Sequence, residues 1–477
     1  MCDSATTSEI LKHFHLLCSV PHGSGNEKAL SNRICEKLYE LGLSPNQDNA
    51  GNIVCDIAGA EGAPLVALQA HLDMVCAVGA PSYQPATDPI RPIQQDGWLR
   101  TAGESSLGAD CGAGVAVMLW LASHDEFPHP PLRLIFTVKE EIGLQGAIMI
   151  DPACMEGVTH FINLDGFSFD TAVIGAAGGV RITMSRPIET EPAPSGLHAY
   201  TLTLSGLRGG HSGEDIDSGR GNAISLLGGA LREYGEGKRL YLAAIRCGTA
   251  SNAIPAQASC VLVTDGNPTS QMQQFNARLA LFYSKTDPDA RFEIAPCEMP
   301  ETVYTEELSR AIIGLMTETV SGVFQYHEDF EELVGDSANF GVLRAEGGKI
   351  VARSMIRFST DFGEENLVGQ HEFAAECNGF SFEIDNRYPA WPAQPDCPLL
   401  NLVRNSYRQA TGQELNVSIR HVGLEPAIFY SYNPDAQFVN LGMTILDCHS
   451  PRERWSIDTI GPFSDMLRDM LAALASA

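Results

Sequence analysis

The sequence lacks several features that mark specialised classes of protein. Its 13 cysteines, an odd number, include no Cys-x-x-Cys pair. No apolar run is long enough for a membrane span or a signal peptide, and there is no low-complexity tract or internal repeat. We therefore expect a cytoplasmic protein whose cysteines are reduced thiols.

Basic residues are also scarce. The chain has 31 Lys and Arg against 59 Asp and Glu, which gives a formal net charge of −28 at pH 7. This charge repels the phosphates of nucleic acids and anionic membrane surfaces, and it favours solubility. We expect no nucleic acid and no membrane as partners. The length of 477 residues is typical of roughly two to three domains.

The stretch from Leu65 to Asp73 is the first that indicates a functional site, because an apolar run ends there in His71 and Asp73. Such a run is typical of a strand covered on both faces, and open α/β sheets place their sites at the C-terminal ends of such strands. Alternation puts both side chains on one side of the strand. They could be a metal ligand and the carboxylate that orients it, or a strand-end histidine with a local hydrogen bond.

Acidic residues also stand near the ends of other strand-like runs. Strand-like runs end near Glu140 with Glu141 and at Asp165, and Asp110 opens a helical run, where it could also be a simple N-cap. Because parallel strands end at one edge of a sheet, we expect these acids to gather near the first histidine. Carboxylates with imidazole suit Zn²⁺, with Mn²⁺ or Co²⁺ as alternatives. His449, after another strand-like run, would complete a second metal site.

Six motifs, taken in order, resemble the aminoacylhistidine (Xaa-His) dipeptidases of the dinuclear-zinc metallopeptidases. They are HLDMV at 71–75, LGADCGAG at 107–114, KEEIGLQG at 139–146, NLD at 163–165, GLRGGHSGEDID at 206–217 and HSPRE at 449–453. The similarity covers nearly the whole chain. It implies an α/β fold, a mixed-sheet dinuclear-zinc peptidase domain with an inserted α+β lid domain.

The sequence also predicts where the insertion lies. Strand-like and helix-like runs alternate between Arg186 and Ile384, which indicates a separate α+β domain. Because segments on both sides supply expected ligands, we interpret it as inserted into the catalytic domain. The expected domains are 1–185 and 385–477 for catalysis and 186–384 for the lid. Strand edges exposed on the lid would favour a homodimer through it.

Carried over position by position, the resemblance implies two Zn²⁺ ions per chain. The implied ligands are His71 and Asp165 for one ion, Glu141 and His449 for the other, and Asp110 as the bridge between them. In related enzymes the peptide bond after the bridging aspartate is cis, which here is the bond to Cys111.

The resemblance also implies catalytic and substrate-binding roles. Asp73 would orient the first histidine ligand, and Glu140 would be the general base that takes a proton from the water shared by the ions and returns it to the leaving amine. His211 would stabilise the oxyanion, although a loop histidine without such a role is the local alternative. Asn252 and Arg357 would hold the substrate, with Arg357 on its C-terminal carboxylate. A solvated strand arginine is the other interpretation of Arg357.

The chain departs from the family pattern next to the expected ligands. Cys111 replaces an asparagine, Gly166 stands where relatives carry an acid, and Pro426 interrupts a usual Cys-Gly pair. Each expected ligand is still in place. Glu425, just before the last departure, is the expected acidic partner of a substrate amino group.

The hypothesis from the sequence is metal-dependent hydrolysis of unblocked dipeptides, with an Xaa-His preference. One alternative is a dizinc amidohydrolase that acts on N-acyl amino acids. Another is a metal-dependent binding protein without catalysis. The presence of Glu140 argues against the second alternative, because a pure binding site needs no base. The expected partner is a small peptide substrate.

Overall fold

The computed structural model describes residues 4–124 and 126–476. The chain divides into two compact units. Unit 1 runs to Ala176 and resumes at Trp391, and unit 2 comprises Ala177–Ala390. Unit 2 is therefore an insertion between two segments that fold together. Among the described residues, no helix has both the length and the hydropathy needed to cross a membrane.

The unit boundaries differ slightly from those expected from the sequence. The expected boundaries fall inside two strands, β9 (Gly178–Pro187) and β21 (Ser381–Tyr388). These strands pair with each other along most of their length, and β9 also pairs with β20 (Lys349–Phe358). Because these pairings join both strands to one sheet, the whole of each strand belongs to unit 2.

Unit 1 is built around a mixed sheet, as the sequence predicted. Its described strands follow the order β1-β2-β6-β3-β7-β23-β8-β22, and β6, β3, β7 and β23 are parallel neighbours. The C-terminal ends of these four strands therefore share one edge. The strands are β1 (Asn46–Gln47), β2 (Ile53–Ile57), β3 (Leu65–His71), β6 (Leu132–Thr137), β7 (Val158–Gly166), β8 (Thr171–Ala176), β22 (Asn416–Arg420) and β23 (Gln437–Gly442).

Strand β3, which ends in His71, is buried along nearly its whole length. Every residue of it after Leu65 is buried, as expected for an apolar strand with a neighbour on each side. Although β2 and β3 follow each other in the chain, they do not form a hairpin, because β6 lies between them. Strand β3 pairs with β6 on one side and with β7 on the other, so neither of its edges is available to β2.

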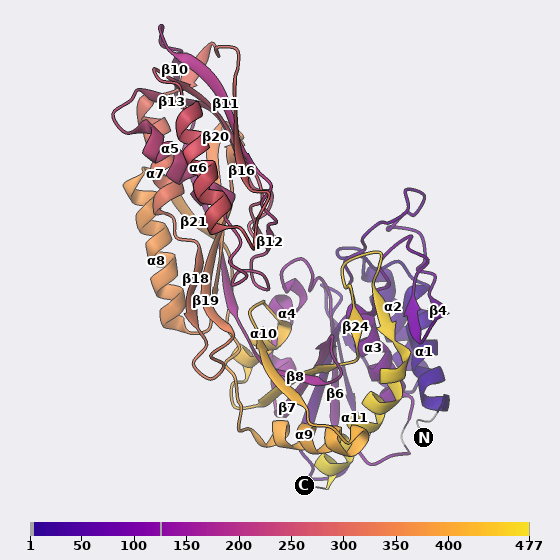
Figure 1. The fold of residues 1–477 in the computed structure, drawn as a ribbon. Coiled ribbons are helices and arrows are strands. Elements are labelled where there is room, and N and C mark those ends of the chain that lie inside the picture. The colour runs from indigo at the N-terminus through magenta and orange to yellow at the C-terminus, as the bar shows by residue number, and fades with distance from the viewer. Residues whose placement is uncertain (1–3, 125, 477) are drawn as a thin grey trace. The chain divides into compact units, whose positions relative to one another are not determined.

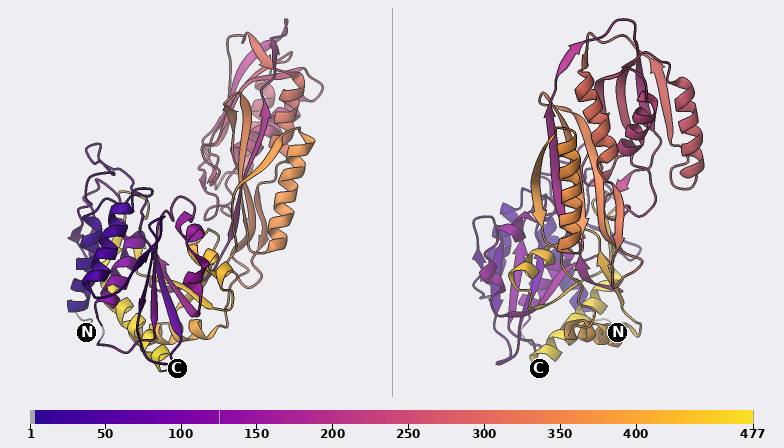
Figure 2. Two further views of the ribbon diagram at one scale, coloured as in Figure 1. Left: turned by 180° about the vertical axis from the view of Figure 1, so that it is seen from behind. Right: turned by 90° about the vertical axis from the view of Figure 1, so that its left-hand side faces the viewer.

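Helices cover both faces of the sheet, with α3 and α11 on one side and α4 and α10 on the other (Figures 1 and 2). Residues 109–121 of α3 are all buried, so the start of this helix is fixed in the core. The helices of unit 1 are α1 (Ser4–Cys18), α2 (Lys28–Glu40), α3 (Ala109–Ala122), α4 (Gln145–Met149), α9 (Pro398–Thr411), α10 (Glu425–Tyr432) and α11 (Ile460–Ala475).

A smaller sheet joins the C-terminal segment to the long loop after β3. Its order is β24 (Ile445–Leu446), β25 (Arg454–Ser456), β5 (Trp98–Arg100) and β4 (Ile93–Gln95). Trp455 pairs with Leu99 across β25 and β5, and its fully buried ring contacts Phe14 edge-on. The loop between β24 and β25 is thereby anchored beside the loop that follows β5.

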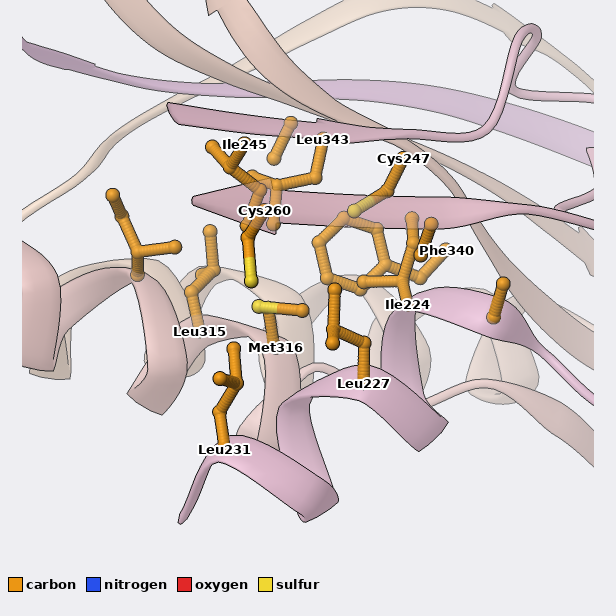
Figure 3. Close-up of a cluster of buried hydrophobic side chains, with 14 of the residues drawn as sticks. Ile224, Leu227, Leu231, Ile245, Cys247, Cys260, Leu315, Met316, Phe340 and Leu343 are labelled. Carbon is orange, nitrogen blue, oxygen red and sulfur yellow. The ribbon is translucent and has the colours of Figure 1, made fainter. Parts of the chain in front are cut away.

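Unit 2 is an antiparallel sheet with helices packed on it. The order is β16-β11-β15-β13-β19-β20-β9-β21, and β18 also pairs with β19. Figure 3 shows Leu227 and Leu231 of α5 and Met316 of α7 against Cys260 and Phe340 of the strands. The remaining elements are β10 (Thr190–Pro192), β11 (His198–Ser205), β12 (Gly210–His211), β13 (Leu240–Cys247), β14 (Ala253–Ile254), β15 (Ala258–Thr264), β16 (Arg291–Pro296), β17 (Thr302–Tyr304), β18 (Gly322–Tyr326), β19 (Val334–Glu346), α5 (Ala223–Gly235), α6 (Thr269–Phe282), α7 (Glu306–Glu318) and α8 (Asp361–Cys377).

Candidate metal centre

The shared edge of β6, β3 and β7 gathers the first group of expected ligands. His71 is the last residue of β3, Glu140 and Glu141 follow β6, and Asp165 lies near the end of β7. His71 Nε2 is 3.5 Å from Asp165 Oδ1. Ligand atoms of His71, Glu140 and Glu141 lie within 4.8 Å of one another. The parallel order of the strands is the reason for this convergence.

Asp110 lies between two imidazoles. Its Oδ1 is 3.2 Å from His71 Nε2, and its Oδ2 is 2.9 Å from His449 Nε2. The peptide bond from Asp110 to Cys111 is cis, as expected, and both residues have non-helical dihedral angles at the start of α3. The carboxylate of Asp110 accepts from these two imidazoles and, among the described residues, from no backbone N–H group. Asp110 therefore does not cap the helix, and its two oxygens face the two imidazoles.

His449 completes the second group. Its Nε2 is also 2.9 Å from Glu141 Oε1, and ligand atoms of Asp110, Glu141 and His449 lie within 4.8 Å of one another. The φ of His449 is 59°, in the left-handed region that residues other than glycine and asparagine seldom adopt. Unfavourable backbone geometry of this kind tends to occur at functional sites. The structure therefore brings together the five ligands implied by the resemblance.

Asp73 holds both the first histidine and the backbone after β6. The Nδ1 of His71 donates to the backbone carbonyl of Asp73 at 2.9 Å, which leaves the Nε2 lone pair for a cation. The carboxylate of Asp73 accepts from the backbone N–H of Glu140 at 2.9 Å and of Glu141 at 3.2 Å. Ser24 donates to it as well. The expected orienting role of Asp73 thus extends to the position of the expected base.

The cluster has strongly shifted pKa values. Hydrogen bonds to Asp110 and Glu141 raise the pKa of His449 to about 11. Burial raises the pKa of Asp165 to about 7, and burial together with repulsion from Glu141 raises the pKa of Glu140 well above its usual value. At neutral pH the cation-free cluster therefore carries protons that a bound metal would displace.

The residues fit a pair of divalent cations. Glu141 Oε1 and Asp165 Oδ1 are buried and accept no well-aligned hydrogen bond, although each lies near an imidazole nitrogen. Asp110 and Glu140 add two further carboxylates, so the cluster can balance the charge of two dications. Imidazole and carboxylate donors are typical of zinc, and each proposed ion has an imidazole and carboxylates around it.

The thiol of Cys111 has an ordinary structural contact. It is 1 % exposed and donates to the backbone carbonyl of Leu164 at 3.3 Å. Burial raises its pKa well above the usual value. This contact accounts for a small buried residue at the start of α3, and the Sγ atom also lies within 4.8 Å of ligand atoms of His71 and Asp165.

Glu425 lies inside unit 1. It is 2 % exposed, and its Oε2 accepts from Thr137 at 2.8 Å and from Gln69 at 2.5 Å. Burial raises its pKa to about 7. Its Oε1 is buried and has no hydrogen-bond partner among the described residues, so the expected contact with a substrate amino group stays a prediction.

The expected substrate residues of unit 2 lie close to one another. His211 pairs with Ala253 between β12 and β14, next to Asn252. Ser212 donates from its backbone to the Asn252 carbonyl at 2.9 Å, and Arg357 Nη2 donates to the Ser212 hydroxyl at 3.4 Å. Residues far apart in the sequence thus form one group within unit 2.

Arg357 is a buried cation without an anion. It is 4 % exposed, its Nη1 donates only a long bond of 3.3 Å to the hydroxyl of Tyr388, and its Nε has no partner. Among the described residues no carboxylate forms an ion pair with it. An unpaired buried charge is costly, so a ligand carboxylate is the natural partner. The interpretation as a solvated strand arginine is wrong, because the guanidinium is buried.

Glu453 is a buried carboxylate for which no role was predicted from the sequence. The structure places it, 2 % exposed, against the backbone that leads into Asp110. The signal available was its place in the HSPRE motif, four residues after His449.

Fold and site together define an α/β metallopeptidase. The chain belongs to the family described as peptidase family M20/M25/M40, whose model matches residues 67–473. This finding and the relatives below confirm the resemblance drawn from the motifs.

Two similar proteins match almost end to end. The cytosol non-specific dipeptidase of Escherichia coli is 29% identical over 466 residues, 96% of each chain. The structure of an aminoacylhistidine dipeptidase from Vibrio alginolyticus has a TM-score of 0.85 and 29% identity, and the match covers 99% of this chain and 97% of that one. A tripeptidase from Staphylococcus aureus, at 16% identity and a TM-score of 0.58 over 99% of each chain, shares the fold.

Proposed function

We propose that this chain is a dizinc dipeptidase that hydrolyses unblocked dipeptides, with a preference for histidine at the C-terminal position. The observation that carries the proposal is the convergence of two imidazoles and three carboxylates from distant segments into two overlapping groups. The names of the E. coli and Vibrio relatives support the substrate class. The relation to the E. coli enzyme also supports a cytosolic location, and a homodimer through unit 2 stays a prediction.

The proposed ligands are those implied by the family resemblance: His71 and Asp165 for one ion, Glu141 and His449 for the other, and Asp110 between them. When bound, the two Zn²⁺ ions would supply Lewis acidity and lower the pKa of the attacking water. The backbone carbonyl of Asp73 accepts the Nδ1 proton of the first histidine, which turns Nε2 toward the ligand group.

Glu140 is the proposed general base. Its carboxylate accepts the proton of the attacking water and delivers it to the nitrogen of the leaving amine. Its backbone N–H is held by the Asp73 carboxylate at 2.9 Å, which fixes the residue beside the ligands.

Arg357 is the proposed anchor for the C-terminal carboxylate of the substrate, and His211 and Asn252 are proposed substrate contacts beside it. A dipeptide carries a free carboxylate directly after the scissile bond, which matches a buried guanidinium without a counter-ion. His211 would donate to the oxyanion that forms at the substrate carbonyl.

A hydrolysis screen of the zinc-loaded protein tests the proposal. We expect free dipeptides to be cleaved, Xaa-His dipeptides fastest, and the activity to vanish on chelation and return with zinc. The panel includes N-acetyl amino acids and tripeptides. Preferred cleavage of N-acetyl amino acids would make the protein an amidohydrolase instead, and metal binding without turnover of any substrate would leave only a binding function.

Replacement of Arg357 by alanine is expected to raise the KM for a free dipeptide by about 10- to 100-fold, the size expected for losing a charged hydrogen-bond partner. The change in kcat should be smaller, because the carboxylate contact is present in both substrate and transition state. The matched control is Arg353→Ala, on the same strand, where the arginine pairs with Glu346 instead. Kinetics on a dipeptide amide give the second comparison, and an unchanged preference for the free acid would exclude the anchor.

A further inference from the structure

A carboxylate that the mechanism does not use holds the backbone leading into Asp110. The two oxygens of Glu453 accept four consecutive backbone N–H groups. Oε2 accepts from Leu107 at 2.8 Å and Gly108 at 3.0 Å, and Oε1 accepts from Ala109 at 2.8 Å and Asp110 at 3.2 Å. Each oxygen is thus bonded to two neighbouring N–H groups.

The backbone is shaped to make these four bonds. N–H groups at the start of a helix have no partner within the helix, and a carboxylate is favoured at that end. Gly108 has a φ of 72°, and an added Cβ there would lie 2.7 Å from Met74 Sδ. Asp110 departs from helical dihedral angles in the same turn. This turn directs successive N–H groups toward one point instead of along the helix axis.

Glu453 also connects two ligands that are distant in sequence. It stands in the loop between β24 and β25 that carries His449, and β25 pairs with β5 directly before the loop that leads to Asp110. The β24–β25 loop therefore supplies one proposed ligand, His449, and also binds the backbone of another, Asp110. The two side chains meet at 2.9 Å, between His449 Nε2 and Asp110 Oδ2.

We propose that Glu453 is a positioning residue that sets the spacing of Asp110 and His449 and thereby the affinity for the second metal ion. The inference rests on the ligand set of the proposed function. Glu453 itself binds no ion in this arrangement, because both of its oxygens are occupied by N–H donors. Loss of a supporting group of this kind typically lowers metal affinity by about 10- to 100-fold.

The variant Glu453→Gln tests this role with the least change in side-chain shape. Glutamine has nearly the same shape but only one acceptor oxygen, so its NH₂ group would face two backbone N–H donors. Half of the four bonds are lost while the packing stays. The matched control is Asp48→Asn in the same unit. Asp48 accepts from the backbone N–H groups of Ala50, Gly51 and Asn52 and from the side chain of Asn52, none of which is a proposed ligand.

The experiment compares the wild-type chain with these two variants. Zinc is titrated against a competing chelator, Co²⁺ binding is followed by its visible absorption, and thermal unfolding is recorded for the metal-free proteins. For Glu453→Gln we expect the ion held by Glu141 and His449 to bind about 10- to 100-fold more weakly, with an altered spectrum for the second Co²⁺. The other ion shares only Asp110 with this segment, so its affinity should fall less. Asp48→Asn should bind both ions as the wild type does.

The outcomes separate this inference from the proposed function. A wild-type chain that binds fewer than two ions would contradict the ligand set itself. Two ions bound to Glu453→Gln with wild-type affinity and spectrum would overturn only the positioning role, even if that variant melts at a lower temperature. Should its metal-free form fail to fold, Glu453→Asp keeps both oxygens on a side chain one methylene shorter. Unchanged binding of both ions by that variant would equally overturn the proposal.

Discussion

The Glu140→Gln variant is expected to keep both metal ions and to lose nearly all turnover. Glutamine retains the size of the side chain and its backbone bond to Asp73, but it cannot take a proton from the attacking water. Removal of a general base typically lowers kcat by about 10²- to 10⁴-fold. Because Glu140 is not a proposed ligand, the metal content should stay at two ions per chain.

Elemental analysis and steady-state kinetics on the same sample check both halves of this expectation. Glu140→Asp serves as the comparison, since it keeps a carboxylate but withdraws it by one methylene, and it should retain part of the activity. If Glu140→Gln turned over substrate at the wild-type rate, another group would have to be the general base. Loss of a metal ion would instead make Glu140 a ligand.

The His449→Ala variant is expected to hold at most one tightly bound ion and to be nearly inactive. His449 supplies the only imidazole of the group formed with Asp110 and Glu141. Its side chain is 49% exposed, so its removal should cost little packing. The loss of affinity should exceed the roughly 10- to 100-fold that follows removal of a supporting group, because a ligand itself is gone.

Metal analysis after dialysis, with thermal unfolding of the metal-free protein, distinguishes loss of the site from loss of the fold. His124→Ala is the matched control, because His124 also faces a carboxylate, that of Glu9 at 3.2 Å, outside the ligand groups. The control should retain two ions. Two ions retained by His449→Ala would refute the proposed ligand set.

Several residues of the site were predictable from local sequence because each stands at the end of an apolar, strand-like run. An apolar strand that ends in His71, a second that ends near Glu140 and a third that ends at Asp165 each carry a signal within about ten residues. Parallel pairing then places such strand ends at one edge, whatever the exact order of the strands. This is why the convergence of these strand ends could be expected without knowing the order of the strands.

Burial was harder to predict than identity. From the sequence, Arg357 was equally compatible with a solvated strand position, and Glu425 was expected to meet substrate. In the structure both are enclosed, Arg357 at 4 % and Glu425 at 2 % exposed. Whether a charged side chain is buried depends on which elements pack over it, and those elements come from distant parts of the chain.

The sequence by itself determined which side chains are available for the chemistry, because their types and spacing within each motif are local properties. Only the tertiary structure decided that His449 meets Asp110, that Glu453 accepts from four N–H groups, and that Arg357 is buried with no ion-pair partner among the described residues. These contacts depend on strand order, loop conformation and packing between segments far apart. No single stretch of the chain encodes them, because each requires two stretches to meet.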